Sequence, residues 1–180
     1  KFLPHRTSLS HRMRERLDQH FMAEISINAG SRLIGQSLGV RMFHELPDIH
    51  VRIINRLGKT TLPPFTGLRL REDDVIALSA TREDLTKLMD SGHGLTPAEG
   101  YRTNPNSHKK SDQIVVEMMI TPSSSLVDNT ISRTSFEYRH NCQVLGIQHH
   151  AHMIRSRMGR AKLAAGDLLL VKCDTETLRG

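Results

Sequence analysis

Two stretches of the sequence decide the fold, because they follow one pattern at a fixed distance along the chain. The first reads EISINAGSRLIGQSLG (residues 24–39), and the second reads EMMITPSSSLVDNTIS (residues 117–132). An offset of 93 residues (117 − 24 = 93) aligns them without a gap and pairs identical residues, namely Glu24 with Glu117, Ile27 with Ile120, Ser31 with Ser124 and Leu33 with Leu126. Self-similarity at a fixed period is typical of a repeated structural unit. We therefore predict two copies of one module.

The same offset continues outward from these stretches. It pairs Phe43 with Phe136, Val51 with Val144, Ile54 with Ile147, Leu70 with Leu163, Asp74 with Asp167 and Glu83 with Glu176. We place the first copy at residues 21–90 and the second at residues 113–180, where we expect the last helix to be cut short. Residues 91–112 have the Pro, Asn, Ser, Gly and Lys content of a linker. Residues 1–20 form a basic lead-in.

Each copy is predicted to run strand, helix, strand, strand, with a closing helix. The expected strands are short runs of branched and apolar residues, at residues 23–28, 51–54 and 75–78 in the first copy and 114–120, 144–147 and 168–171 in the second. Hydroxyl residues suited to N-capping begin the expected helices at residues 31–46 and 124–139, and Thr81 begins the closing helix. The predicted fold class is α+β, with two tandem copies of a small β-α-β-β(-α) module, each a small sheet with helices.

An acidic residue precedes the last strand of each copy. In Ala165-Gly166-Asp167 the glycine can adopt a positive φ, and the aspartate can accept a hydrogen bond from its own downstream backbone. Asp73 replaces this glycine in the first copy, so we expect that turn to be held differently. A tight turn explains these residues, and we interpret the acid as structural, not catalytic.

The composition excludes several function classes. The 180 residues contain no run approaching the roughly 18 apolar residues that a membrane-spanning helix needs. The net charge of +6 is diffuse, and two Tyr and five Phe offer few rings for stacking, so we expect no nucleic-acid partner. Cys142 and Cys173 match no metal or redox spacing and are expected to be free thiols in a reducing compartment. The chain begins at Lys1 without a secretory pattern, so we expect a piece of a longer protein.

The order of these features resembles the TrkA-C module, also called RCK-C. The resemblance rests on a strand carrying a Glu, a Ser in the next turn, a Leu-(Ile/Val) pair followed by (Ser/Thr)-(Leu/Ile), a Phe, a Val-x-x-Ile strand and an acid before the last strand. These features fall at Glu24, Ser31, 33–38, Phe43, 51–54 and 70–75, and again at Glu117, Ser124, 126–131, Phe136, 144–147 and 163–168. As a tandem pair, the chain is most similar to the cytoplasmic insert of divalent anion:sodium symporter-like transporters.

This resemblance implies a regulatory domain of a bacterial membrane ion or anion transporter, at the cytoplasmic face of the inner membrane, and not an enzyme. Its implied partners are the membrane-spanning part of the same chain, the other copy of the module, and a second chain in a homodimer. The implied effector is a nucleotide or another small anion, without a resident cofactor. One alternative is an assembly domain of a transporter, or of a potassium channel or uptake system, that binds no small molecule. No Gly-x-Gly-x-x-Gly stretch points to a dinucleotide site.

Cationic and amide side chains near the second strand of each copy are the candidate ligands for an anion. They are His44, His50 and Arg52 in the first copy and Arg133, Arg139 and Gln143 in the second. A solvated basic rim is the alternative interpretation.

His150 and His152 would share one face of a strand and are weak candidates for a metal site, against a polar strand end as the alternative. Residues 123–125 are three serines, but they lack the glycine-flanked elbow of a nucleophile. We therefore predict no catalytic residue.

Overall fold

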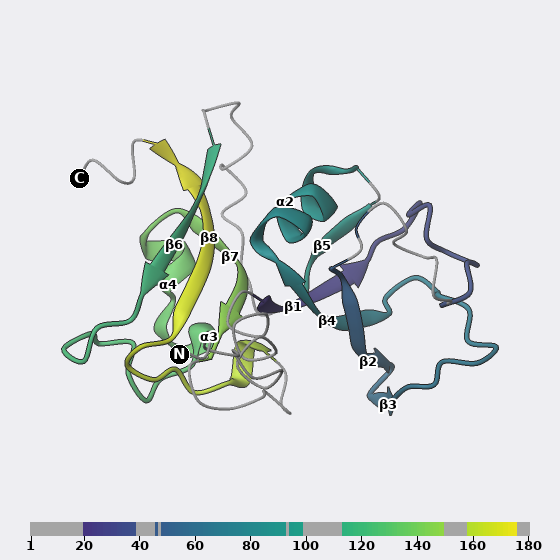
Figure 1. Cartoon of the computed structure of the whole chain (residues 1–180), viewed down its shortest axis with the longest axis horizontal. Coiled ribbons are helices and arrows are strands. Elements are labelled where there is room, and N and C mark those ends of the chain that lie inside the picture. The colour runs from purple at the N-terminus through teal and green to yellow at the C-terminus, as the bar shows by residue number, and fades with distance from the viewer. Residues whose placement is uncertain are drawn as a thin grey trace, which may run out of the picture.

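A single antiparallel sheet organises the chain in the computed structural model, which describes residues 20–38, 46, 48–92, 94–98, 113–149 and 158–175. Its strands are β1 (His20–Ile27), β2 (His50–Arg56), β3 (Lys59–Thr61), β4 (Val75–Thr81), β5 (Leu95–Pro97), β6 (Gln113–Met119), β7 (Cys142–Gln148) and β8 (Leu168–Asp174). The order across the sheet is β3-β2-β4-β1-β7-β8-β6, and β5 pairs with β1 (Figure 1). The first half of the sheet therefore comes from residues 20–98, and the second half from residues 113–175.

Helices are few and short in the described part of the chain. They are α2 (Arg82–Asp90), α3 (Ile131–Thr134), α4 (Phe136–Arg139) and one 3-10 turn at Met158–Arg160. The predicted cap of α2 is confirmed, because the Thr81 hydroxyl accepts a hydrogen bond from the Asp84 N–H. None of these helices is long and apolar enough to cross a membrane. The fold is thus a mostly antiparallel sheet with few helices, as expected of a small α+β protein.

The two halves repeat each other's backbone hydrogen bonds at the offset of 93 residues. The Ile27 N–H donates to the Asp74 carbonyl, and the Ile120 N–H donates to the Asp167 carbonyl. Isolated bridges join residue 37 to residue 69 and residue 130 to residue 162. The register also shifts at the same place in β2 and β7, between residues 51 and 53 and between residues 144 and 146. The strand assignments therefore agree in the two halves, within one to three residues of the predicted bounds.

The predicted helices at residues 31–46 and 124–139 are wrong over their first half. Residues 31–38 and 124–130 instead form turns and a bridge, and only residues 131–134 and 136–139 are helical. Gly35 and Asp128 take left-handed φ values of 82° and 61°, which a continuing helix does not allow. Their N–H groups donate to the carbonyls of Leu70 and Leu163, so each turn is tied to the segment before the last strand. Residues 39–45 lie outside the described part.

The turns before β4 and β8 are built mostly as predicted. Gly166 has a φ of 89°, and Asp73 occupies the corresponding left-handed position with a φ of 62°. The direction of the side-chain bond was wrong, because the Asp167 carboxylate accepts from the upstream Ala164 N–H. Within the predicted linker, residues 95–97 are strand β5 and pair with β1. These residues therefore belong to the sheet of the first half.

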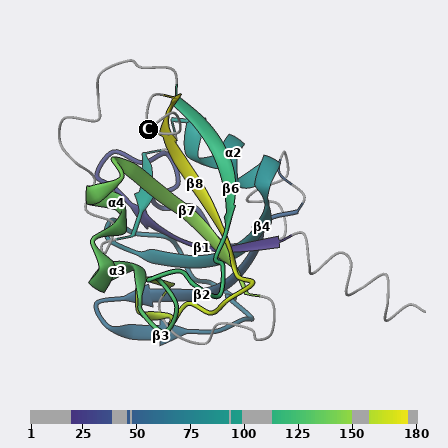
Figure 2. The same ribbon diagram turned by 90° about the vertical axis from the view of Figure 1, so that its left-hand side faces the viewer.

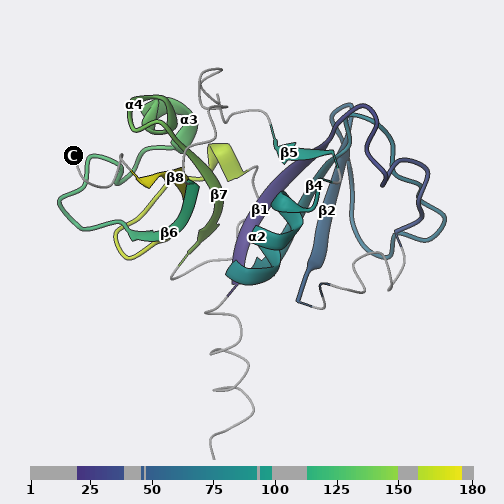
Figure 3. The ribbon, with the colours of Figure 1, turned by 90° about the horizontal axis from the view of Figure 1, so that it is seen from above.

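The hydrophobic core of the first half continues onto the second. It includes Leu85 and Leu88 of α2 together with Leu145 of β7 and Leu170 of β8. A separate core in the second half lies on the opposite face of the same strands, where Val144, Leu169 and Val171 are buried. The sheet of the second half is therefore covered on both faces, which accounts for its continuous apolar strand at residues 168–171. Figure 3 shows α2 beside β1, with β7 next to β1 on its other side.

Candidate functional site: a cationic cluster, two buried acids and the joint between the halves

Two of the six predicted anion ligands lie together on β2. Arg52 donates from Nε to the Ser79 hydroxyl of β4 over 3.2 Å, and His50 is the cross-strand partner of Ser79. The His50 ring stacks on the ring of His20, with 5.9 Å between centroids. His50 and Arg52 are exposed. His20, His50, Arg52 and Ser79, which we call the β2 cluster, thus place two imidazoles and a guanidinium beside the buried hydroxyl of Ser79.

The three candidates of the second half are more scattered. Arg133 lies on α3, Gln143 lies on β7, and Arg139 lies on α4, where its Nη2 donates to the Thr134 carbonyl over 2.7 Å. Arg133 and Arg139 are exposed, and Gln143 is half-buried. The position that corresponds to Arg52 is occupied by Leu145, which is buried in the core of the first half. His44, His150 and His152 fall outside the described residues.

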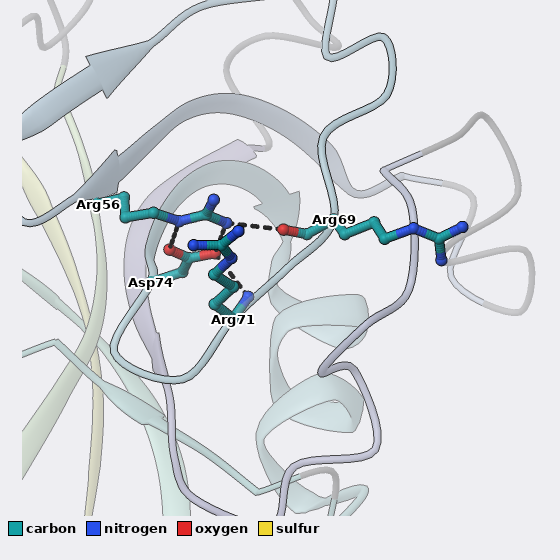
Figure 4. A network of polar contacts seen from close by, with 4 residues as sticks. All are labelled: Arg56, Arg69, Arg71 and Asp74. Atoms are coloured by element: carbon teal, nitrogen blue, oxygen red, sulfur yellow. Dashed lines mark hydrogen bonds and ion pairs between the residues drawn. The ribbon is translucent and has the colours of Figure 1, made fainter.

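A buried acid anchors the turn before β4. Asp74 has a fully buried side chain and accepts two hydrogen bonds of 2.6 Å from the Arg56 guanidinium (Figure 4). Its Oδ2 also accepts from the Arg71 N–H over 2.8 Å. The same guanidinium reaches the Arg69 carbonyl, so it ties the end of β2 to the turn (Figure 4). The hydrogen bond and charge of Asp74 raise the pKa of Arg56.

The second half builds the same turn with a histidine in place of the arginine. Asp167 corresponds to Asp74, and it accepts from the Ala164 N–H where Asp74 accepts from Arg71. His149 takes the place of Arg56 at the offset of 93, with its Nδ1 2.7 Å from the Asp167 carboxylate. This pairing of a histidine with an acid was not evident from sequence spacing, although the offset of 93 residues aligns His149 with Arg56. Both acids hold their turns through these contacts. Within the described residues, no group of three or more His, Cys, Asp or Glu is placed to hold a metal ion.

The joint between the halves is made where β1 meets β7. Met22 of β1 pairs with Ile147 of β7, and this is the one pair recorded between these strands. Gly146 lies beside it, where a Cβ atom would come within 2.9 Å of the Phe21 Cβ and 3.2 Å of the Met22 carbonyl oxygen. Gly146 therefore permits the close approach of β1. The corresponding residue of β2 is Ile53, and a lone glycine inside a strand was the signal that could have located this joint.

Polar contacts of α2 with β6 and β8 also join the first half to the second. Arg82, at the start of α2, donates to the Val115 carbonyl of β6 and forms an ion pair of 3.3 Å with Glu117. Asp90, at the end of α2, pairs with Lys172 of β8 over 2.9 Å. Figure 2 shows β6, β8 and β7 side by side, with α2 close to β6. The helix thus crosses the sheet of the second half and contacts it at both of its ends.

One further carboxyl is buried beside the second core. Glu137 of α4 accepts a hydrogen bond of 2.8 Å from the Val144 N–H of β7. Burial raises its pKa to about 8, although this hydrogen bond acts in the opposite direction. Glu137 is therefore mostly protonated at neutral pH, and it was not among the residues that the sequence singled out.

The second half, with three antiparallel strands and two short helices, has the form of a small α+β domain. More particularly, residues 115–179 match the TrkA-C domain, a family of regulatory, not catalytic, domains. The chain is also similar to an uncharacterized transporter of Synechocystis sp., with 29% identity over 166 residues. This match covers 89% of the chain and 27% of the relative's length, and no solved structure matches.

Proposed function

We propose that the chain is a cytoplasmic regulatory module of a membrane transporter, built from two tandem TrkA-C-like copies. The observation that carries this proposal is the match of residues 115–179 to the TrkA-C domain, together with a relative that is described as a transporter. The hydrogen bonds repeated at the offset of 93 residues support assigning the first half to the same module. The membrane-spanning part of the same chain is its proposed partner.

The β2 cluster is the proposed effector site, and a small anion is its ligand. A guanidinium that donates to a hydroxyl, beside two stacked imidazoles, suits phosphate or carboxylate oxygens. A ligand regulates a protein only by binding one of its conformations better than another. The joint between β1 and β7 is the element that such a ligand would bias, because β2 and β1 both pair with β4.

Thermal unfolding of the purified chain tests the sensing role. Inorganic phosphate, sulfate, mononucleotides and cyclic dinucleotides are added separately, and a saturable rise in Tm for one of them is expected from its binding to the folded state. Arg52→Glu is expected to abolish that rise, and Lys59→Glu, with the same charge change at an exposed position of β3, is the control. A Tm shift that survives in Arg52→Glu contradicts the assignment of the site. Arg139→Glu tests the second half in the same way.

The second candidate is an assembly domain without a small-molecule ligand. It is favoured by the joint itself, since the two halves already associate through a sheet edge and a helix face. In this case Tm depends on protein concentration through dimer formation and not on any anion of the panel. Sedimentation velocity across a concentration series, run beside the thermal experiment, separates the two functions.

A further inference from the structure

The two cysteines of the chain, far apart in sequence, are direct neighbours across the sheet. Cys142 opens β7 and Cys173 lies near the end of β8, and the register of the two strands makes them partners. Sequence spacing predicted two free thiols, and it could not show which strands would pair. Their juxtaposition is a property of the fold.

Hydrogen bonding shows what kind of pair they form. The Val144 N–H donates to the Glu137 carboxyl and so does not point toward β8. Val144 and Val171 are therefore a non-hydrogen-bonded pair, and because the two kinds alternate along an antiparallel ladder, so are Cys142 and Cys173. The pairing of β8 with β6 leads to the same result. The Ile120 N–H donates to the Asp167 carbonyl, and alternation along this ladder directs the backbone N–H and C=O of Cys173 toward β6, away from β7.

A non-hydrogen-bonded pair brings two cysteines within bonding range. Its Cα atoms lie about 4.5 Å apart and its side chains project from the same face. Disulfides span Cα separations of about 4.4–6.8 Å, so this pair is at the short end of the range, where the bond is formed under strain and is more easily reduced.

The surroundings of the pair control its reactivity. Cys173 is buried in the second core, whereas Cys142 is half-buried and accessible from the surface. Burial raises the pKa of the Cys142 thiol to about 12, and the charges of Glu137 and Cys173 act in the same direction. Burial likewise raises the pKa of Cys173, with Asp174 adding to it. Both residues are therefore thiols at neutral pH, and their oxidation is slow.

We propose that Cys142 and Cys173 are a site of reversible oxidation, at which a low-molecular-weight disulfide converts the two thiols into a cross-strand disulfide. Cys142, the accessible thiol, loses its proton and attacks one sulfur of the small disulfide, whose other sulfur leaves as a thiol with that proton. Cys173 then loses its proton and attacks the Cys142 sulfur, and the second small thiol leaves. In total two electrons and two protons pass from the protein to the small disulfide. The new bond fastens the start of β7 to the end of β8, and excess small thiol reverses it.

Mass spectrometry of the intact, folded chain tests the proposal. The reduced protein is incubated with oxidised glutathione, blocked with a maleimide and weighed before and after dithiothreitol. The chain has only two cysteines. The expected product is a monomer that has lost two hydrogen atoms, carries no glutathione and accepts no maleimide, whereas after dithiothreitol it accepts two. A product with two bound glutathiones, or a disulfide-linked dimer, overturns the proposal.

Two sets of variants test whether formation of the disulfide depends on the register of β7 and β8. Cys142→Ser and Cys173→Ser each retain one thiol, and Cys142→Ser is expected to react more slowly because its remaining thiol is buried. Combining Cys142→Ser with Gln143→Cys moves the accessible thiol by one residue, to the opposite face of β7. This double variant is expected to form a mixed disulfide with glutathione and no internal bond. An internal bond in the double variant would mean that closure needs no particular register, and it overturns the proposal.

Discussion

At the scale of single residues, two aspartates hold corresponding turns of the two halves in place. Asp74 is fully buried, and it joins the end of β2 to the turn before β4 through Arg56 and the Arg71 N–H. Asp167 joins the corresponding segments through His149 and Ala164. Because a buried carboxylate of this kind is stabilised only by its partners, removal of either partner leaves the other with an unmet charge.

Asp74→Ala is expected to lower the free energy of unfolding by about 3 kcal/mol, because Arg56 loses its bidentate partner and the Arg71 N–H loses its acceptor. Urea denaturation measures the change. Glu83→Gln is the control, since the pair of Glu83 with Lys87 is exposed on α2 and lies within a single helix. Equal losses in the two variants would contradict a special role for the buried pair.

Glu137 gives the stability of the chain a distinctive pH dependence. Burial raises its pKa in the folded state from 4.5 to about 8, so the folded protein keeps a proton that the unfolded chain releases between these values. The free energy of unfolding therefore falls as pH rises through this window, by about 1 kcal/mol per pH unit from this residue. Glu137→Gln retains an oxygen that can accept from Val144 and removes the titration. Its denaturation curves are expected to show a flatter dependence on pH and a gain in stability at the alkaline end, and an unchanged slope would contradict the assignment.

At the scale of elements, the strands were predictable and the helices after the first strand of each half were not. Apolar and branched runs between turn residues fix the strands locally. The segments at residues 31–38 and 124–130 have hydroxyl residues and a helical spacing, but their backbone groups bond to the distant residues 70 and 163. Such a long-range bond competes with helix formation and leaves no signature in the segment itself. Of the candidate anion ligands, His50 and Arg52 lie on β2 and Gln143 lies on β7, whereas Arg133 and Arg139 lie on the short helices before β7. Their spacing did not reveal which of them would meet in space.

Gly146 tests the joint between β1 and β7. Gly146→Ala is expected to destabilise the chain by about 2 kcal/mol, because the new methyl group meets the Phe21 Cβ at 2.9 Å and the Leu85 Cδ2 at 3.1 Å. Gly159→Ala is the control, since its Cβ would meet only the Ser132 hydroxyl, which can rotate away at the cost of its hydrogen bond to the Gly159 carbonyl. Thermal unfolding compares the two, and a smaller loss at Gly146 than at Gly159 would argue against a close-packed joint.

For the whole molecule, the offset of 93 residues matches the hydrogen bonds that recur in the two halves, but it does not indicate how the halves meet. The edge strand of the first half that joins the second is β1, whereas the strand it meets is β7, the counterpart of β2. The contact is therefore head-to-tail, and the two halves use different surfaces. Aligning the two copies does not reveal which strands meet at the joint, because the residues on each surface also pack within their own half. Two local features of the sequence reflect this contact between the halves, namely Gly146 and strand β8, which is buried on both faces.

A head-to-tail contact between similar units can be repeated from one unit to the next, and such contacts form rings or open filaments. The position in β2 that corresponds to Ile147 is Ile54, and β3 already occupies its outer side through Thr61. The position in β6 that corresponds to Met22 is Val115, whose outward carbonyl already accepts from Arg82. Both growing ends of the sheet are therefore blocked, one by a hairpin and one by a single guanidinium. A chain carrying Thr61→Pro and Arg82→Ala loses both blocks, and we expect it to elongate into fibres that electron microscopy would detect.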